Sequence, residues 1–160
     1  MEEINIRTLV RLYPNLMELP KDIRELFEAA AEARAKAYAP YSNFQVGAAL
    51  RLASGKIITG SNQENASFPS GLCAERTAVF YAGAQYPTEN IIAMAITVKS
   101  LNQTVDTPIS PCGACRQSLL EYEVKQGQNI PIYFRGETGK IAQVSAVQEL
   151  LPFAFSGKLL

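Results

Sequence analysis

The chain has 160 residues, of which 48% are hydrophobic and 19% charged, a composition typical of a globular protein that excludes a disordered one. Its 15 lysine and arginine residues balance 15 aspartate and glutamate residues, so the net charge favours neither nucleic acid nor an anionic membrane as a partner. The longest strongly apolar stretch, residues 91–98, is too short for a membrane helix, and the start MEEINIRT is acidic where a secretory signal is basic, which predicts a soluble cytoplasmic protein.

The first segment in the chain, residues 1–20, is expected to form an appended arm whose shape and role the sequence leaves open. Residues 21–160 are expected to form a single domain, because no linker or internal repeat divides them. Apolar residues recur at helical spacing over 22–38, which predicts an amphipathic helix with Asp22 and Glu25 placed for a capping box.

Strand-like residues over 44–62, interrupted by the turn signal Ser54-Gly55, predict a hairpin of two strands. Further elements are expected in the order helix from Cys73, strand over 90–100, helix from Cys112, strands over 130–136 and 140–146, and a short C-terminal helix. This order predicts an α/β fold in which helices flank a mixed five-stranded sheet.

The chain contains three cysteines and no histidine. Cys112 and Cys115 have the C-x-x-C spacing, which without a secretion signal indicates metal or redox chemistry before disulfides. If Cys73 and Cys112 open two helices, both helix N-termini aim at one point and favour thiolates there. Three thiolates leave one position open in the tetrahedral shell of Zn²⁺, which is typical of a catalytic zinc site.

Glu75 follows Cys73 closely, and in the first turn of a helix both side chains can face a site in front of the helix. A carboxylate beside a zinc-bound water can act as a proton shuttle. Arg76 and Arg116 each lie close to a cysteine in the sequence, and a guanidinium there would offset the negative charge of three thiolates.

These residues resemble the zinc signature of the cytidine deaminases in its all-cysteine version, CAE followed by PCGAC. The resemblance runs from about Phe27 to Phe155, through AYAPYSNFQVGAAL, NQENAS, CAER, PCGACRQ and ELLPFAF. It implies a three-layer cytidine-deaminase-like fold, one Zn²⁺ per subunit and a small homotetrameric enzyme.

The resemblance also implies a role for individual residues. Cys73, Cys112 and Cys115 match the zinc ligands, and Glu75 matches the proton shuttle. Phe44 matches the residue that stacks on the pyrimidine, and Asn62 and Glu64 match the pair that binds the ribose 3′-hydroxyl. The Ala66 carbonyl and the Ala74 N–H match contacts to the base edge. Arg76 and Gln117 match groups around the thiolates, and Phe155 matches an aromatic residue that enters a neighbouring subunit's site.

The activity implied by the resemblance is hydrolysis at C4 of free cytidine and deoxycytidine, with zinc-bound hydroxide as nucleophile and Glu75 moving the protons. Glu64 adds a physical expectation, since a fixed carboxylate near the sugar repels phosphate and favours nucleosides over nucleotides. One departure is Phe68, which stands where many members of the family have tyrosine, so a hydroxyl contact is lost.

Several alternatives remain open at this point. A non-catalytic zinc-binding module or a redox C-x-x-C would leave Glu75 without a purpose, and a purely structural zinc site usually has four protein ligands. Editing of cytosine in RNA or DNA calls for a basic groove, which the balanced charge argues against. Within the family, a cytosine nucleoside analogue such as an antibiotic is a further candidate substrate. Phe44 and Phe155 could also simply belong to the core.

Overall fold

The computed structural model describes residues 1–157 and shows one mixed sheet of six strands in the order β1-β6-β5-β4-β2-β3. The strands are β1 (Arg11–Tyr13), β2 (Phe44–Leu52), β3 (Ile57–Ser61), β4 (Ile91–Ser100), β5 (Ile132–Arg135) and β6 (Ile141–Val144). Strands β4 and β5 run parallel, and the other neighbouring pairs are antiparallel.

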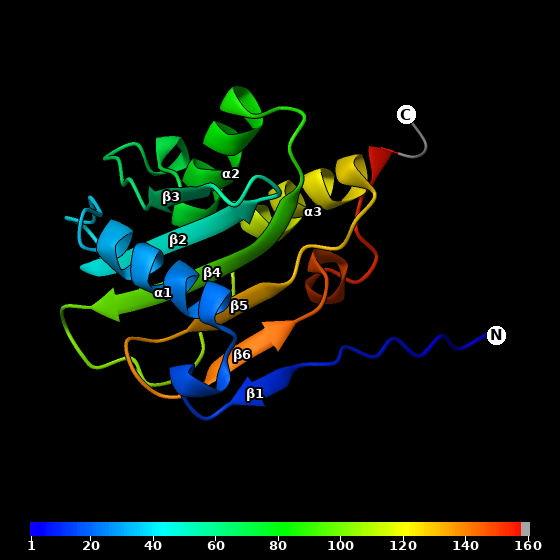
Figure 1. Cartoon of the computed structure of the whole chain (residues 1–160), viewed down its shortest axis with the longest axis horizontal. Helices are drawn as coiled ribbons and strands as arrows, with labels where there is room; N and C mark the ends of the chain where they lie inside the picture. Colours follow the sequence, from blue (N-terminus) through cyan, green and yellow to red (C-terminus); the bar gives the residue numbers. More distant parts are fainter. Residues whose placement is uncertain (158–160) are drawn as a thin grey trace.

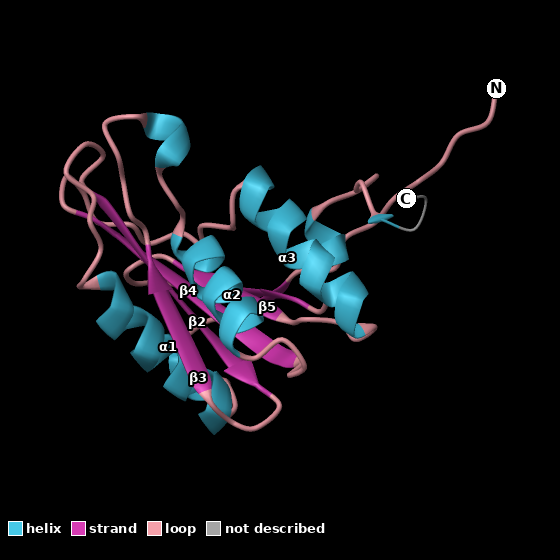
Figure 2. Cartoon of the chain, turned by 90° about the horizontal axis from the view of Figure 1, so that it is seen from above, coloured by secondary structure: helices cyan, strands magenta, loops and turns pink. Residues whose placement is uncertain are grey.

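Three α-helices cover the two faces of this sheet and give the molecule three layers (Figures 1 and 2). Helix α1 (Lys21–Arg34) lies on one face, and helices α2 (Ala74–Gln85) and α3 (Gly113–Gln126) lie on the other. Short 3₁₀ helices connect these elements: η1 (Leu16–Glu18), η2 (Phe68–Ser70) and η3 (Val147–Leu150). Within residues 1–157, no helix has both the length and the apolarity to cross a membrane.

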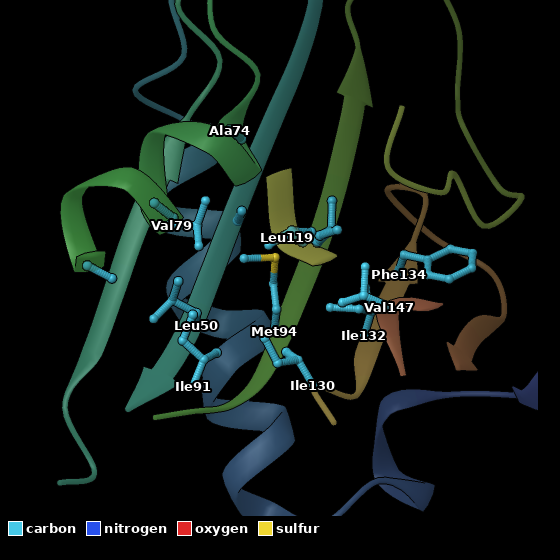
Figure 3. Close-up of a cluster of buried hydrophobic side chains, with 14 of the residues drawn as sticks. Leu50, Ala74, Val79, Ile91, Met94, Leu119, Ile130, Ile132, Phe134 and Val147 are labelled. Carbon is cyan, nitrogen blue, oxygen red and sulfur yellow. The ribbon is translucent and has the colours of Figure 1, made fainter. Parts of the chain in front are cut away.

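The core sits on both faces of the central strand β4, because successive side chains of a strand point to opposite faces. Met94 and Ile96 face α2 and α3, whereas Ala93 and Ala95 face α1. Figure 3 shows Met94 packed among side chains from strands and helices, including Leu119 of α3. Burial on both faces explains why the sequence of β4 is continuously apolar rather than alternating.

The predicted α/β class, the mixed sheet and the hairpin are confirmed, but the sheet has six strands rather than five. The additional strand is β1, which comes from the N-terminal arm and pairs antiparallel with β6. Its three residues carry no strand pattern of their own, and the pairing depends on the exposed edge of β6. The hairpin turns at Gly55, whose φ of 86° is readily accessible to glycine.

Two details of the first helix differ from the prediction. Helix α1 ends at Arg34 instead of Tyr38. The backbone of Tyr38 donates a hydrogen bond to the carbonyl of Asn62 and accepts one from the N–H of Glu64, beside β3. The prediction of a capping box is wrong. Pro20 is the N-cap, and the Glu25 carboxylate accepts a hydrogen bond from Arg51 at 2.9 Å. The predicted short C-terminal helix is the 3₁₀ helix η3.

Candidate active site

The three cysteines come together at the N-terminal ends of two helices. Cys73 is the N-cap of α2, Cys112 is the N-cap of α3, and Cys115 lies in the first turn of α3. The Sγ atoms of Cys73 and Cys112 are 3.8 Å apart, those of Cys112 and Cys115 are 3.5 Å apart, and all three lie within 4.8 Å of one another. The predicted convergence of the three thiols is confirmed.

The spacing of these sulfur atoms fits a single zinc ion. In a tetrahedral site with Zn–S bonds of about 2.3 Å, neighbouring sulfurs are about 3.8 Å apart, close to the separations observed here. Cys115 is buried, Cys73 is partly exposed and Cys112 is exposed, so the cluster is open to solvent on one side. The cluster therefore combines three soft donor atoms with an accessible fourth side.

The pKa values of the thiols indicate that negative charge in the cluster is favoured at the sulfur of Cys73. A hydrogen bond from Cys115, with further hydrogen bonds from Arg76 and Cys112, lowers the pKa of Cys73 to about 5. The same hydrogen bond to Cys73, together with burial, raises the pKa of Cys115. Negative charge at Cys73 thus disfavours negative charge at Cys115, and a bound cation would offset this repulsion.

Arg76 is the cation that the protein itself supplies to this cluster. Its guanidinium lies 3.7 Å from the Sγ of Cys73, and the hydrogen bond to this thiol is the main cause that raises the pKa of Arg76. The Nε atom of Arg76 is buried and has no hydrogen-bond partner among residues 1–157. Arg76 is therefore held against the sulfurs, as predicted from its place in CAER.

Glu75 is buried beside the sulfur cluster, with 4% of its surface exposed. Burial is the main cause that raises the pKa of its carboxyl group to about 7, and the negative charge of Cys73 adds to this effect. A carboxyl group with such a pKa gains and loses a proton readily near neutral pH. Its position in the first turn of α2 lets it face the same cavity as Cys73.

The geometry of this turn depends on close packing between α2 and β3. A Cβ atom added at Gly60 of β3 would lie 2.6 Å from the backbone nitrogen of Ala78 and would also collide with the carbonyl oxygen of Ala74. Glycine at position 60 thus lets the first turn of α2, which carries Glu75, rest directly on the sheet.

Cys73, Cys112 and Glu75 form one wall of a cavity of about 750 Å³. Phe44, Asn62 and Glu64 also line this cavity, and their substrate contacts stay predictions. Its other lining residues are Tyr41, Ser42, Val46, Gln63, Asn65, Phe68, Gly71, Leu72, Arg76, Ile96, Val98, Ile109 and Ser110. One continuous space therefore joins the sulfur cluster to the polar residues of the loop after β3.

Glu64 and Asn62 are both held in place by hydrogen bonds. The Glu64 carboxylate accepts hydrogen bonds from the hydroxyl and the N–H of Ser42 and from the N–H of Tyr41. The hydrogen bond from the Ser42 hydroxyl is the main cause that lowers the pKa of Glu64. The side chain of Asn62 accepts from the N–H of Val46 at 2.8 Å and donates to the carbonyl of Phe44 at 2.9 Å.

Other predicted site residues do not line the cavity. Ala74 is the first residue of α2 and is fully buried, whereas Ala66 is exposed, and neither lines the cavity. Gln117 donates to the carbonyl oxygen of Phe155 at 3.0 Å, and the side chain of Phe155 is exposed outside the cavity. The roles of these residues stay predictions.

Arg116 makes three hydrogen bonds that its sequence position did not indicate. Its guanidinium donates to the carbonyl oxygen of Pro111 at 2.8 Å, to the Ser110 hydroxyl at 2.8 Å and to the carbonyl oxygen of Leu150 at 3.0 Å. Arg116 therefore connects the loop before Cys112 with the end of η3, and its predicted effect on the thiolates stays a prediction.

Sequence reasoning missed several residues that line the cavity. One is Tyr41, whose ring packs edge to face against that of Phe68 in η2 with centroids 5.9 Å apart. Ile109 and Ser110 lie just before the Cys112 loop. Tyr41 stands within the motif that contains Phe44 and could have been found there, whereas Ile109 lies in a segment that carries no recognisable pattern.

A three-layer α/β fold with a three-cysteine cluster beside a buried carboxyl group defines a metal-dependent hydrolytic enzyme, and comparisons with known proteins give its family. The family model for the cytidine and deoxycytidylate deaminase zinc-binding region matches residues 20–128. The chain belongs to this family.

Individual relatives agree with this assignment. Cytidine deaminases of Halalkalibacterium halodurans and Sporosarcina psychrophila are 39% and 38% identical to this chain, over 86% and 84% of its length and over 96% and 92% of theirs. A crystal structure of cytidine deaminase from Burkholderia pseudomallei superimposes with a TM-score of 0.70 at 42% identity, covering 82% of this chain and 97% of that one. The zinc-binding family and the sulfur cluster together identify zinc as the cofactor.

Proposed function

We propose that this protein hydrolyses free cytidine and deoxycytidine to uridine and deoxyuridine with release of ammonia, in cytoplasmic salvage of pyrimidine nucleosides. The observation that carries this proposal is the buried Glu75 carboxyl group, which faces the same cavity as the sulfur cluster. A zinc site that only stabilised the fold would have no use for such a group. The relatives named above are cytidine deaminases, which supports the choice of substrate.

Cys73, Cys112 and Cys115 hold the zinc ion in this proposal. When bound, zinc lowers the pKa of water and so supplies a nucleophile for hydrolysis at neutral pH. Arg76 lies against the Cys73 sulfur and offsets part of the negative charge of the three thiolates. Less electron density on the sulfurs leaves the metal a stronger Lewis acid.

Glu75 moves the protons of the reaction. Its carboxylate takes a proton from the attacking water and delivers it to N3 of the cytosine ring, which makes C4 more electrophilic. It then takes the proton of the new C4 hydroxyl group and passes it to the C4 amino group, so that the C4–N bond breaks and ammonia leaves. Burial favours the neutral form of this carboxyl group and so assists the proton uptake that each turnover requires.

The residues around the cavity bind and orient the nucleoside. Phe44 packs against the pyrimidine ring, and Asn62 and Glu64 bind the ribose 3′-hydroxyl. The carbonyl of Ala66 and the N–H of Ala74 contact the edge of the base. Support comes from the lining of the cavity, which Phe44, Asn62 and Glu64 share with Cys73 and Cys112.

Glu64 also selects nucleosides over nucleotides. Its carboxylate is fixed by Tyr41 and Ser42, and the lowered pKa keeps it ionised at neutral pH. A phosphate on the sugar would bring negative charge toward this carboxylate, and like charges at short range repel. We therefore expect cytidine to be converted much faster than cytidine monophosphate.

The active enzyme is proposed to be a homotetramer in which Phe155 enters a neighbouring site. Phe155 keeps 69% of its surface exposed within its own subunit, although it is large and apolar. The hydrogen bond between Gln117 and the Phe155 carbonyl fixes the direction of the C-terminal segment. In this proposal the deaminase domain spans residues 21–160, and residues 1–20 are an extension of it, consistent with a family match that begins at residue 20.

The test is a deamination assay on zinc-loaded protein, followed by the loss of cytidine absorbance and by identification of uridine. We expect one zinc per chain and turnover of cytidine and deoxycytidine, with slower turnover of cytidine monophosphate and of single-stranded oligonucleotides. A protein that carries full zinc but leaves both nucleosides unchanged would overturn the proposal. Turnover of a cytosine antibiotic in the same assay, with both natural nucleosides untouched, would establish the alternative within the family.

A further inference from the structure

Residues 1–10 of the N-terminal arm leave the body of the molecule as an extended segment that precedes β1 (Figures 1 and 2). All ten residues are exposed. The arm lies outside the family match, which begins at residue 20, so the catalytic domain does not explain it. Its contact with the body is the β1–β6 ladder and a hydrogen bond from the Thr8 hydroxyl to the Glu149 carbonyl at 2.8 Å.

The central part of the arm has an alternating pattern. Ile4 and Ile6 are exposed by 73% and 49%, and Glu3, Asn5 and Arg7 alternate with them. In an extended chain, the two isoleucines lie on one face and the three polar residues on the other. Within residues 1–157, no hydrogen bond joins residues 3–7 to the body of the molecule. Residues 3–7 therefore form a short extended segment with one apolar face, one polar face and no hydrogen bond to the part of the body that the structure describes.

The five residues of this strand, Glu3-Ile4-Asn5-Ile6-Arg7, are self-complementary in one antiparallel register. When two copies are paired about Asn5, Glu3 of each copy stands opposite Arg7 of the other, and Ile4 stands opposite Ile6. The two Asn5 residues meet at the centre. Directly opposed residues in an antiparallel pair lie on the same face of the ribbon. Each Glu3 carboxylate therefore meets an Arg7 guanidinium, and each Ile4 side chain meets an Ile6 side chain.

We propose that the arms of two copies of this chain pair as antiparallel strands centred on Asn5. The pairing is isologous: both copies contribute the same residues, as in a two-fold symmetric contact. One face of the resulting ribbon carries the isoleucines of both copies, and the opposite face carries two Glu3–Arg7 ion pairs on either side of Asn5.

Other registers of the same two arms lose these matches. A slip of one residue places isoleucine opposite a polar side chain along the whole segment. The register that sets Glu3 opposite Arg11 brings the two Arg7 side chains face to face, and directly opposed like charges are destabilising. The charge pattern thus selects both the partner, a second copy, and the register.

The pairing acts within a larger assembly. A two-stranded ribbon alone is at best marginally stable in water. Subunits that are already held together raise the effective concentration of the arms and make their pairing intramolecular. This step rests on the proposed homotetramer, but the pairing itself can be detected by a covalent trap whether or not the protein is active.

The trap is the variant Asn5→Cys in the full-length, zinc-loaded protein under mild oxidation. Opposed Cβ atoms in an antiparallel pair lie about 4.5 to 5.5 Å apart, close enough for a disulfide after a small adjustment. The matched control is Glu2→Cys, whose two copies would be about 20 Å apart in this register at about 3.3 Å per residue. We expect the Asn5→Cys dimer to form at least about tenfold faster, on a denaturing gel, than the Glu2→Cys dimer. Equal rates for the two variants would refute the pairing.

A charge exchange tests the register. In the Asn5→Cys background, Glu3→Arg and Arg7→Glu should each slow cross-linking, because each places like charges opposite one another. The double exchange restores opposite charges and should restore the rate. A double variant as slow as the single ones would overturn the register. All variants should keep full zinc and deaminase activity, because the arm lies away from the cavity.

Discussion

Replacement of Glu123 by glutamine should destabilise the protein strongly. Glu123 lies in α3 with 6% of its surface exposed, and its carboxylate accepts hydrogen bonds from three backbone N–H groups. These come from Ile130 at 2.8 Å, Val147 at 2.7 Å and Gln148 at 3.1 Å. Glu123 thereby joins α3 to the segment just before β5 and to η3.

The size of the effect follows from the direction of these hydrogen bonds. An amide can keep one oxygen acceptor, but its NH₂ group must face a backbone donor, so at least one buried N–H loses its partner. The remaining hydrogen bonds also lose the assistance of the negative charge. An unsatisfied buried donor costs about 1 to 3 kcal/mol, and the total loss should be about 2 to 4 kcal/mol in the free energy of unfolding.

The assay is thermal unfolding of the zinc-loaded protein, followed by circular dichroism at one protein concentration. For a chain of this size, a loss of about 2 to 4 kcal/mol lowers the Tm by about 5 to 15 °C. The matched control is Glu121→Gln, an exposed residue of the same helix, which should stay within about 2 °C of the wild type. A Glu123→Gln variant that melts with the wild type would refute this account of the buried carboxylate.

Three further predictions concern the site. Glu75→Gln should retain zinc but lower kcat at least about 10²-fold, because the amide cannot carry the proton. Gly60→Ala should lower kcat/KM with zinc still bound, because the new Cβ displaces the first turn of α2, which carries Glu75. Phe155→Ala should raise KM for cytidine, because this side chain, exposed on its own subunit, is proposed to enter a neighbouring site. Steady-state kinetics and metal analysis measure these effects.

Each of these predictions has a result that contradicts it. Unchanged turnover in Glu75→Gln would remove this residue from the mechanism. Wild-type kinetics in Gly60→Ala would show that the packing of α2 on β3 does not position the site. For Phe155→Ala, the neighbouring exposed Phe153 provides the control, and equal effects of both alanine substitutions would argue against a specific role for Phe155.

Much of the site could be predicted from the sequence because its chemistry depends on residue type and local spacing. The C-x-x-C pair and Cys73 sit at helix N-termini, where the spacing of three residues and the capping position place the sulfurs together. Glu75 could be found in the same way, since it shares the first turn of α2. The raised pKa of Glu75 could not, because it depends on burial by residues distant in the sequence.

Features that depend on contacts between residues distant in the chain could not be predicted from the sequence. Strand β1 exists because β6 offers an edge, and no pattern in its three residues indicates this. Arg116 was expected near the thiolates, but its hydrogen bonds to Pro111 and Leu150 depend on where η3 packs. Glu123 resembles an ordinary charged helix residue until the fold brings the N–H groups of Val147 and Gln148 to it.

X-ray absorption at the zinc edge of the purified holoenzyme tests the central claim most directly. The measurement counts the sulfur and lighter atoms around the metal and gives their distances. The account predicts one zinc per chain with three sulfur neighbours at about 2.3 Å and one oxygen or nitrogen neighbour at about 2.0 Å. Four sulfur neighbours, or a zinc ion that remains after Cys73, Cys112 and Cys115 are all replaced by serine, would contradict it.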